Sequence, residues 1–233
     1  MDKRQISFTA QQFAAMIDQT LLKPAACDAD FQRFCAVSAQ YGFKMVAINS
    51  VMTKRCKELL HGSTVHVGAA VGFPLGQTTI AAKRFETAEA IESGADEIDY
   101  VVNLVELKSG HLDYVEREMR EIVQVCRAQG IISKVIFENC YLTDEEKKQL
   151  CEIARKVGPD FIKTSTGFGP SGATVEDVRL MKRLAGDRIK VKAAGGIRDL
   201  ETALAMIEAG AERLGTSSGV ALMEAYQRWK GES

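Results

Sequence analysis

The stretch Phe161-Ile162-Lys163-Thr164-Ser165-Thr166-Gly167 places a lysine in a short apolar segment that ends in hydroxyl side chains and a glycine. A second stretch, Lys190 to Gly196, repeats this pattern with Lys192 and two closing glycines. Both patterns predict a buried strand followed by a tight turn. An ammonium group held among strand residues loses hydration, so its pKa falls and the neutral amine becomes available as a nucleophile. With Lys192 as a neighbouring cation, the two stretches predict Schiff-base chemistry at Lys163.

Further apolar segments extend this pattern along the chain and alternate with helical patterns. A short first strand is expected around Ile17 to Thr20. The other expected strands are Lys44 to Asn49, His66 to Gly72, Glu97 to Asn103, Ser133 to Asn139, Phe161 to Gly167, Ile189 to Gly196 and Arg213 to Ser218. Regular alternation of strands and helices indicates a parallel sheet with right-handed crossovers. Eight units in this length predict a single TIM (β/α)8 barrel, an α/β fold. An open doubly wound sheet is the alternative, but the first strand-helix turn lacks the GxGxxG pattern.

The helices between these strands have recognisable start and stop signals. Thr143-Asp144-Glu145-Glu146 is a capping box, and its helix is expected to stop near Gly158. Thr174 opens a helix that Gly186 ends, and Asp199 opens one that runs to Gly210. Thr78 or Thr79 begins another, which ends at Gly94.

The length and composition favour one catalytic domain over residues 1–233. The chain has 233 residues and 46% hydrophobic content, which is enough for a full core. Length alone would permit two domains, but no proline-rich, serine-rich or low-complexity linker is present. The 30 basic and 31 acidic residues are spread along the chain, so we expect neither nucleic-acid nor membrane binding. The charged N-terminus, Met1 to Gln5, lacks the apolar core of a leader, which predicts a cytoplasmic protein.

The cysteines and histidines favour neither disulfides nor a transition-metal site. The six cysteines contain no CxxC pair, which fits reduced thiols in a cytosolic protein. His61, His66 and His111 lack metal-ligand spacing, so we expect no metal and no cofactor, with oxygen-ligated Mg²⁺ left open.

The alternation of residues along the strands predicts a charged barrel interior, because every second residue of a barrel strand faces inward. If Lys163 faces inward, the same parity on four consecutive strands and on the first strand predicts an inner set of four acids and four lysines, with Ser165. These charged residues are Asp18, Glu97, Asp99, Glu138, Lys134, Lys163, Lys190 and Lys192. Buried charges must balance if desolvation is not to destroy stability. A rim position in water is the open alternative for Lys134 and Lys190.

Read together, these segments resemble the deoxyribose-phosphate aldolase family, class I (Schiff-base) aldolases on a TIM barrel. The resemblance runs nearly end to end and is most specific in the lysine strand, the AAGGIR turn and the GTSSG turn. The matching segments are Ile17 to Pro24, Gly72 to Gly76, Glu97 to Asp99 with Val102 and Asn103, Lys134 to Glu138, Phe161 to Gly167, Val191 to Arg198 and Leu214 to Gly219.

The resemblance implies reversible cleavage of 2-deoxy-D-ribose 5-phosphate into D-glyceraldehyde 3-phosphate and acetaldehyde. It implies that Lys163 forms an iminium with the carbonyl carbon and that Lys192 lowers the pKa of Lys163 and helps to move protons. Asp99 would act through a water as general acid and base, and Asp18 would orient Lys192. The implied partners are a phosphorylated sugar and acetaldehyde, and a homo-oligomer is possible.

The glycine turns after strands seven and eight predict a phosphate site on physical grounds as well. Backbone N–H groups and hydroxyls in these loops, beside a helix N-terminus, can surround an anion. The candidates are Gly167, Gly195, Gly196, Gly215, Ser217 and Ser218, with Arg198 left open.

The chain departs from the family pattern at several places. Ala47 and Ser50 stand where the family usually has a cysteine and a proline, and strand five continues Glu138-Asn139 instead of Glu-Thr. In the resemblance that cysteine is a liability toward reactive aldehydes, so we expect retained activity with altered aldehyde sensitivity. The sequence also lacks the C-terminal tyrosine that some members use.

Two other functions remain open. A sister Schiff-base aldolase or transaldolase would keep Lys163 and the phosphate turns but take a ketone donor. A catalytically silent sugar-phosphate binding protein would have no need of two adjacent buried lysines.

Overall fold

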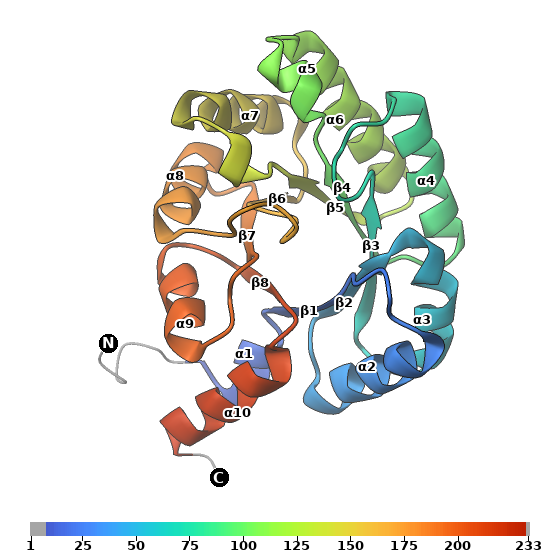
Figure 1. Ribbon diagram of the computed structural model, residues 1–233, viewed down its shortest axis with the longest axis vertical. Coiled ribbons are helices and arrows are strands. Elements are labelled where there is room, and N and C mark those ends of the chain that lie inside the picture. The colour runs from blue at the N-terminus through green and yellow to red at the C-terminus, as the bar shows by residue number, and fades with distance from the viewer. Residues whose placement is uncertain (1–7, 232–233) are drawn as a thin grey trace.

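Eight parallel strands form a closed barrel in which each strand pairs with its neighbours in sequence and the last pairs with the first (Figure 1). This computed structural model describes residues 8–231, so Met1 to Ser7, Glu232 and Ser233 lie outside the described residues. The strands are β1 (Ile17–Leu21), β2 (Met45–Asn49), β3 (His66–Val71), β4 (Glu97–Val101), β5 (Ile132–Ile136), β6 (Phe161–Lys163), β7 (Lys190–Ala194) and β8 (Arg213–Thr216). The predicted fold and its eight strands are confirmed.

Helices surround the barrel on its outer side (Figure 1). The α-helices are α1 (Ala10–Ala14), α2 (Asp28–Tyr41), α3 (Thr53–Leu59), α4 (Ile80–Glu92), α5 (Leu104–Lys108), α6 (Leu112–Ala128), α7 (Asp144–Val157), α8 (Val175–Ala185), α9 (Leu200–Glu208) and α10 (Gly219–Lys230). Two short 3-10 turns are η1 (Ser50–Met52) and η2 (Asn139–Tyr141). No helix of the described residues has the length and apolar character needed to cross a membrane.

The predicted helix signals act at the expected positions. Thr143 and Glu146 form a reciprocal capping box at the start of α7, and Gly158 ends that helix with a φ of 77°. The side chains of Thr79, Thr174 and Asp199 cap α4, α8 and α9. Each accepts one backbone N–H from the first turn of its helix. Each such cap contributes about 1 kcal/mol, so the boundaries of these helices are encoded locally.

Six strands, β3 to β8, end earlier than the sequence predicts, and the difference is largest for β5 and β6. β4 stops at Val101 because Asn103 turns its side chain back to cap α5, where it accepts from the N–H groups of Val105 and Glu106. β5 stops at Ile136, and β6 stops at Lys163. Side-chain hydrogen bonds of this kind compete with the strand ladder and favour the turn.

The hydrophobic core lies between the strands and the helices. Ile98, Tyr100 and Val135 face outward from the barrel and are fully buried in one cluster with Val115 and Met119 of α6. The apolar residues of α6 recur at the helical spacing of three and four that a single buried face requires. The strand residues of the opposite parity are therefore apolar and pack against the helices.

The predicted charged interior exists, but Glu138 is wrong as a member of it, and for Lys190 the alternative of a rim position in water holds. Glu138 lies beyond the end of β5, where its φ of 57° breaks the strand alternation, and its side chain turns to Thr166. Lys190 is exposed as the first residue of β7, and its ammonium lies 5.7 Å from the centre of the Phe161 ring. Lys134, in contrast, is fully buried and does not reach the rim.

Arg213, the first residue of β8, takes a place in the interior that the sequence analysis did not assign. Its Nε donates to Asp18 across 2.6 Å, and its terminal nitrogen contacts both carboxylate oxygens of Glu97 at 3.0 Å. Alternation along β8 signals this position, because Arg213 shares its parity with Gly215 and Ser217. Arg213 is 5% exposed, and its guanidinium closes the charged interior toward the amino ends of the strands.

Replacement of Arg213 with methionine is expected to lower the free energy of unfolding by about 3 to 5 kcal/mol, because two buried carboxylates each lose one of their cationic partners. Urea denaturation measures this loss. Arg84→Met is the matched control, since Arg84 pairs with Glu121 at the surface, where such pairs contribute under about 1 kcal/mol. Equal losses in the two variants would contradict a supporting role for Arg213.

Candidate active site

Lys163 is the last residue of β6 and places its amine inside the barrel at the carboxyl end of the strands. The residue is 4% exposed, and its Nζ lies 2.9 Å from Oδ2 of Asp99 on β4. The register pairs Lys163 directly with Lys192 of β7. Neighbouring parallel strands therefore hold the two lysines side by side, as the sequence predicts.

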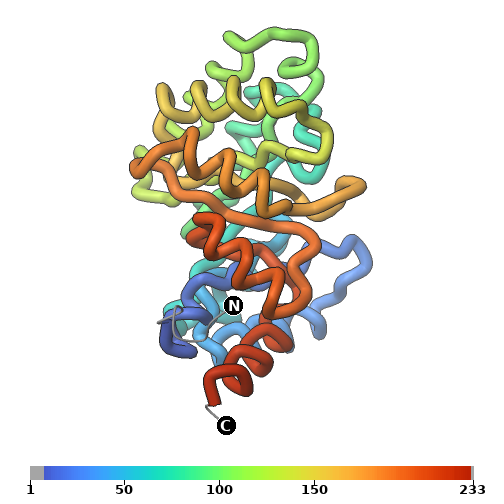
Figure 2. The backbone as a smooth tube through the Cα atoms, turned by 90° about the vertical axis from the view of Figure 1, so that its left-hand side faces the viewer, coloured from blue at the N-terminus to red at the C-terminus, as the bar shows by residue number. Residues whose placement is uncertain are grey.

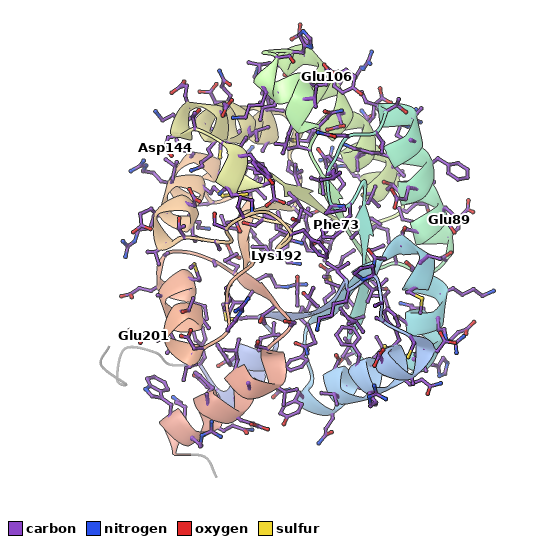
Figure 3. The ribbon with its side chains drawn as sticks, in the orientation of Figure 1. Phe73, Glu89, Glu106, Asp144, Lys192 and Glu201 are labelled. Atoms are coloured by element: carbon purple, nitrogen blue, oxygen red, sulfur yellow. The ribbon has the colours of Figure 1, made fainter. Side chains whose placement is uncertain are left out.

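Asp99 is the centre of the charged interior. Its Oδ2 accepts from both Lys163 and Lys192, the latter across 2.7 Å, and its Oδ1 accepts from Lys134 across 2.7 Å. Lys192 lies within the ring of strands (Figure 3), where its Nζ also contacts Oδ2 of Asp18 at 2.6 Å. The predicted contact between Asp18 and Lys192 is thus present.

The surroundings of Lys163 and Asp99 lower the pKa of both side chains. Burial lowers the pKa of Lys163 to about 8, with Asp99 opposing the shift and Lys192 adding to it. Burial alone would raise the pKa of Asp99, but the ammonium groups of Lys134, Lys163 and Lys192 together hold it well below its usual range. Asp99 is therefore a carboxylate, and the amine of Lys163 gives up its proton more easily than that of an ordinary lysine.

A lower layer of charge supports this site from the amino ends of the strands. Glu97 accepts from Lys134 and Arg213 and contacts Nδ1 of His66 at 2.7 Å. Burial opposes the ionisation of Glu97, but Lys134, His66 and Arg213 outweigh it and keep its pKa low. Asp18 joins the two layers, because it contacts Arg213 below and Lys192 above.

The charges of this interior balance without Lys163. The three carboxylates of Asp18, Glu97 and Asp99 face three other cations, which are Lys134, Lys192 and Arg213. Adding a proton to Lys163 gives the buried set a net positive charge, which a low-dielectric interior disfavours. Charge balance thus favours the neutral, nucleophilic form of Lys163.

A cavity of about 640 Å³ opens above Lys163. Figure 2 shows the β1–α2 segment (blue) and the β6–α8 segment (orange) projecting on the same side of the molecule, and both contribute to its wall. The glycine turns after β7 and β8 also line the cavity. Among the predicted phosphate ligands, the cavity is lined by Gly167, Gly195, Gly196, Gly215 and Ser217, together with Arg198.

Backbone donors in this cavity wall are free to bind an anion. Within residues 8–231, the N–H groups of Gly167, Gly196 and Ser217 have no hydrogen-bond acceptor, whereas those of Phe168 and Ser218 do. Ser218 differs from the other candidates, because it does not line the cavity and its N–H donates to Thr216. The wall nonetheless offers several N–H groups within one concave surface, an arrangement suited to phosphate.

Gln19 on β1 is a further cavity residue that the sequence analysis missed. Its Oε1 accepts the N–H of Gly219, the first residue of α10, across 3.0 Å. Gln19 is 8% exposed and lines the cavity. It therefore fixes the N-terminus of α10 against β1, and no motif in the sequence signals this contact.

The two departures near β2 lie beside the site. Ala47 is buried and shares the strand parity of Met45, whose sulfur accepts from Lys134 inside the barrel. Ser50 begins η1, and its hydroxyl donates to Glu86 across 2.8 Å. The loop that follows β2 is therefore held by a side-chain hydrogen bond at this position.

Within residues 8–231, no three His, Cys, Asp or Glu side chains gather in a geometry that could hold a metal ion.

A closed parallel barrel whose reactive side chains and cavity lie at the carboxyl ends of the strands is the arrangement of a TIM-barrel enzyme. Comparison with known proteins defines the kind of enzyme. The model of the DeoC/LacD family aldolases matches residues 12–225, and the chain belongs to this aldolase family.

Relatives and a solved structure agree with this assignment over nearly the full length. The chain is 52% identical to a deoxyribose-phosphate aldolase of Bacteroides thetaiotaomicron over 99% of both chains. It is 54% identical to one of Lactobacillus acidophilus over 95% of this chain and 94% of the relative. The tetrameric deoxyribose phosphate aldolase of Aeropyrum pernix superposes with a TM-score of 0.88 at 33% identity, covering 95% of this chain and 93% of that one.

The lowered pKa predicts how Lys163 reacts as the pH changes. Trapping of acetaldehyde on Lys163 by a brief borohydride pulse should rise with pH and reach half its maximum near pH 8, because the amine is neutral above its pKa. Mass spectrometry of the Lys163 peptide across the pH range measures this midpoint. Lys192→Met should move the midpoint upward, and a midpoint near the free lysine value in the unmodified chain would contradict the assignment.

Proposed function

We propose that this chain catalyses the reversible cleavage of 2-deoxy-D-ribose 5-phosphate into D-glyceraldehyde 3-phosphate and acetaldehyde through a Schiff base on Lys163. One observation carries the proposal: a buried amine of lowered pKa lies beneath a cavity whose wall presents free backbone N–H groups. The relatives named deoxyribose-phosphate aldolase, at about half identity over nearly the whole chain, support the same substrate.

In the proposed mechanism, the neutral amine of Lys163 attacks the substrate carbonyl and the carbinolamine loses water to form an iminium. The iminium draws electrons from the carbon-carbon bond that breaks, which releases glyceraldehyde 3-phosphate and leaves an enamine. Protonation of the enamine and hydrolysis then release acetaldehyde and restore the amine. Burial contributes most to keeping Lys163 reactive, and Lys192 adds to it.

Asp99 and Lys192 are proposed to handle the protons. Asp99 contacts Lys163 directly, so exchange with the amine needs no intervening water, whereas a water would extend its reach to the substrate. Because its pKa is held low, Asp99 returns any proton it accepts at once. Lys192 contacts the same oxygen of Asp99 and can pass a proton to it, and Asp18 fixes the orientation of Lys192.

The phosphate is proposed to bind at the glycine turns. The N–H groups of Gly167, Gly195, Gly196 and Ser217 lie on one wall, with Gly215 giving the backbone room and Arg198 adding positive charge. Ser218 contributes at most through the N-terminus of α10, since it does not line the cavity. A bound phosphate would place the other end of the sugar toward Lys163.

We also propose that the protein works in the cytoplasm and assembles with copies of itself. The six cysteines are all free, which fits a reducing compartment. The related Aeropyrum pernix enzyme is described as a tetramer, which makes sedimentation of this chain the direct test of assembly.

Incubation with acetaldehyde and borohydride should leave an ethyl adduct of about 28 Da on Lys163, since only an activated amine forms the imine efficiently. Peptide mapping locates the adduct, and cleavage of deoxyribose 5-phosphate is assayed in parallel. Lys163→Ala should abolish both signals. Lys190→Ala is the matched control, because Lys190 lies on the rim of the next strand.

Other outcomes of this experiment point elsewhere. Adducts scattered over surface lysines would sink the Schiff-base assignment and favour a silent sugar-phosphate binder. An adduct with a ketone donor but not with acetaldehyde would indicate a sister aldolase.

Ala47→Cys should keep the cleavage activity but lose it faster during incubation with excess acetaldehyde, because the variant places a thiol on the inner face of β2. Residual activity over time measures the change. Ala47→Ser controls for the added volume, and equal lifetimes of the two variants would contradict the role assigned to this position.

A further inference from the structure

Glu138 is unusual in both its backbone and its burial. Within residues 8–231 it is the one residue other than glycine with a positive φ, at 57°. Its residue exposure is 3%. A side chain larger than that of glycine destabilises this left-handed conformation. The structure retains the conformation, so contacts of the Glu138 side chain must offset the strain.

Those contacts go to the segment between β6 and α8. Oε1 of Glu138 accepts the N–H of Thr166 across 3.1 Å, and Oε2 accepts the Thr166 hydroxyl. The same hydroxyl oxygen accepts the N–H of Phe168 across 3.0 Å. Next to Glu138, the N–H of Asn139 donates to the carbonyl of Thr164 across 2.9 Å. Glu138 and its neighbour thus hold the segment from Thr164 to Phe168.

The Glu138 carboxylate has no cationic partner in the part of the chain that the structure describes. This distinguishes it from Asp18, Glu97 and Asp99, which all face lysine or arginine. Besides the two Thr166 donors, the Cys140 thiol donates to Oε1 of Glu138 across a longer distance of 3.8 Å. A buried carboxylate destabilises the fold unless hydrogen bonds stabilise it. For Glu138 these hydrogen bonds come almost entirely from Thr166.

The position of Glu138 places it on the far side of this segment from the phosphate cavity. It lines a separate cavity of about 490 Å³ with Leu75, Val105 and Tyr141, and it does not line the cavity above Lys163. Thr166 and Phe168 line both cavities and form the wall between them. Glu138 therefore acts on the phosphate cavity only through the β6–α8 segment.

The two hydrogen bonds determine which backbone donor faces the phosphate cavity. The N–H groups of Thr166 and Phe168 are engaged, one by Glu138 and the other by the hydroxyl that Glu138 orients. The N–H of Gly167 between them has no acceptor among residues 8–231, and Gly167 lines the phosphate cavity. We propose that Glu138 is a positioning residue that holds the β6–α8 segment so that the Gly167 N–H meets the substrate phosphate.

This inference rests on the proposed function and concerns one part of its site. It is tested by the kinetics of Glu138→Ala and Glu138→Gln on 2-deoxyribose 5-phosphate and on unphosphorylated 2-deoxyribose. Glu138→Ala should raise KM for the phosphorylated sugar by about tenfold or more, because two hydrogen bonds to a charged acceptor are lost. Its kcat/KM for the unphosphorylated sugar should change by less than about threefold. Glu138→Gln keeps the shape and one acceptor, so its effect should be intermediate.

Glu86→Ala is the matched control. Glu86 also anchors a loop through one N–H and one hydroxyl, since it accepts from Gly72 and Ser50, both across 2.8 Å. The anchored β3–α4 segment contributes no residue to the phosphate cavity. Figure 3 shows Phe73 of this segment at the carboxyl end of β3. Phe73 of this segment contacts the Phe168 ring, with 5.2 Å between the centroids, but Glu86 makes no hydrogen bond to Thr166 or Phe168. Glu86→Ala should therefore raise KM for the phosphorylated sugar by less than Glu138→Ala does.

Two results would overturn the positioning role: equal losses on the two sugars in both Glu138 variants, or an unchanged KM for the phosphorylated sugar. Thermal unfolding checks that each variant is folded. If Glu138→Ala is not folded, the near-isosteric Glu138→Gln is used for the kinetic comparison. Titration with inorganic phosphate separates this inference from the proposed function. If the unmodified chain fails to cleave the sugar phosphate, the function fails, while weaker phosphate binding by a folded Glu138 variant still supports the positioning role and equal binding refutes it.

Discussion

The carboxylate of Asp99 is the interaction on which the rest of the structure depends. A closed barrel leaves a narrow interior, and here that interior contains charges instead of only apolar side chains. Asp99 accepts hydrogen bonds from three lysine side chains at once, which makes it possible to bury Lys134, Lys163 and Lys192 close to one another. Without a shared anion, repulsion among these cations would destabilise the barrel or remove protons from the lysines.

Stability and reactivity are located in different layers of the molecule. The apolar core between strands and helices drives folding, and it contains no charged member of the site. The lower charged layer, in which Arg213 joins Asp18 and Glu97, fixes the upper layer without reaching the cavity. Burial lowers the pKa of Lys163 to about 8, whereas at Lys134 the carboxylates of Asp99 and Glu97 outweigh burial and raise the pKa. The reactivity of Lys163 thus follows from a balance of buried charges that exists before any substrate binds.

Much of this could be predicted from the sequence, because period-two alternation, glycine turns and helix caps are local signals. They were sufficient for the eight strands and for Asp18, Asp99, Lys163 and Lys192. Alternation failed at Glu138, because it holds only while a strand continues and β5 had already ended. Alternation also could not show that Lys190 reaches solvent. It predicts on which face of the strand a side chain lies, but not how far along the barrel axis the residue is placed. Long-range contacts such as that of Gln19 with α10 join residues 200 positions apart and leave no local pattern.

The same short segments carry both the reactive amine and the proposed phosphate ligands. Gly167 follows Lys163 by four residues, and Gly195 follows Lys192 by three, so the barrel itself sets the separation between amine and anion site. A substrate held by its phosphate would present its carbonyl at a distance that rigid strands define, and phosphate binding energy could then be used to align the reacting atoms. This arrangement requires each glycine turn to keep its conformation. A buried anchor such as Glu138, bound to the turn from its far side, meets that requirement without occupying the space of the substrate.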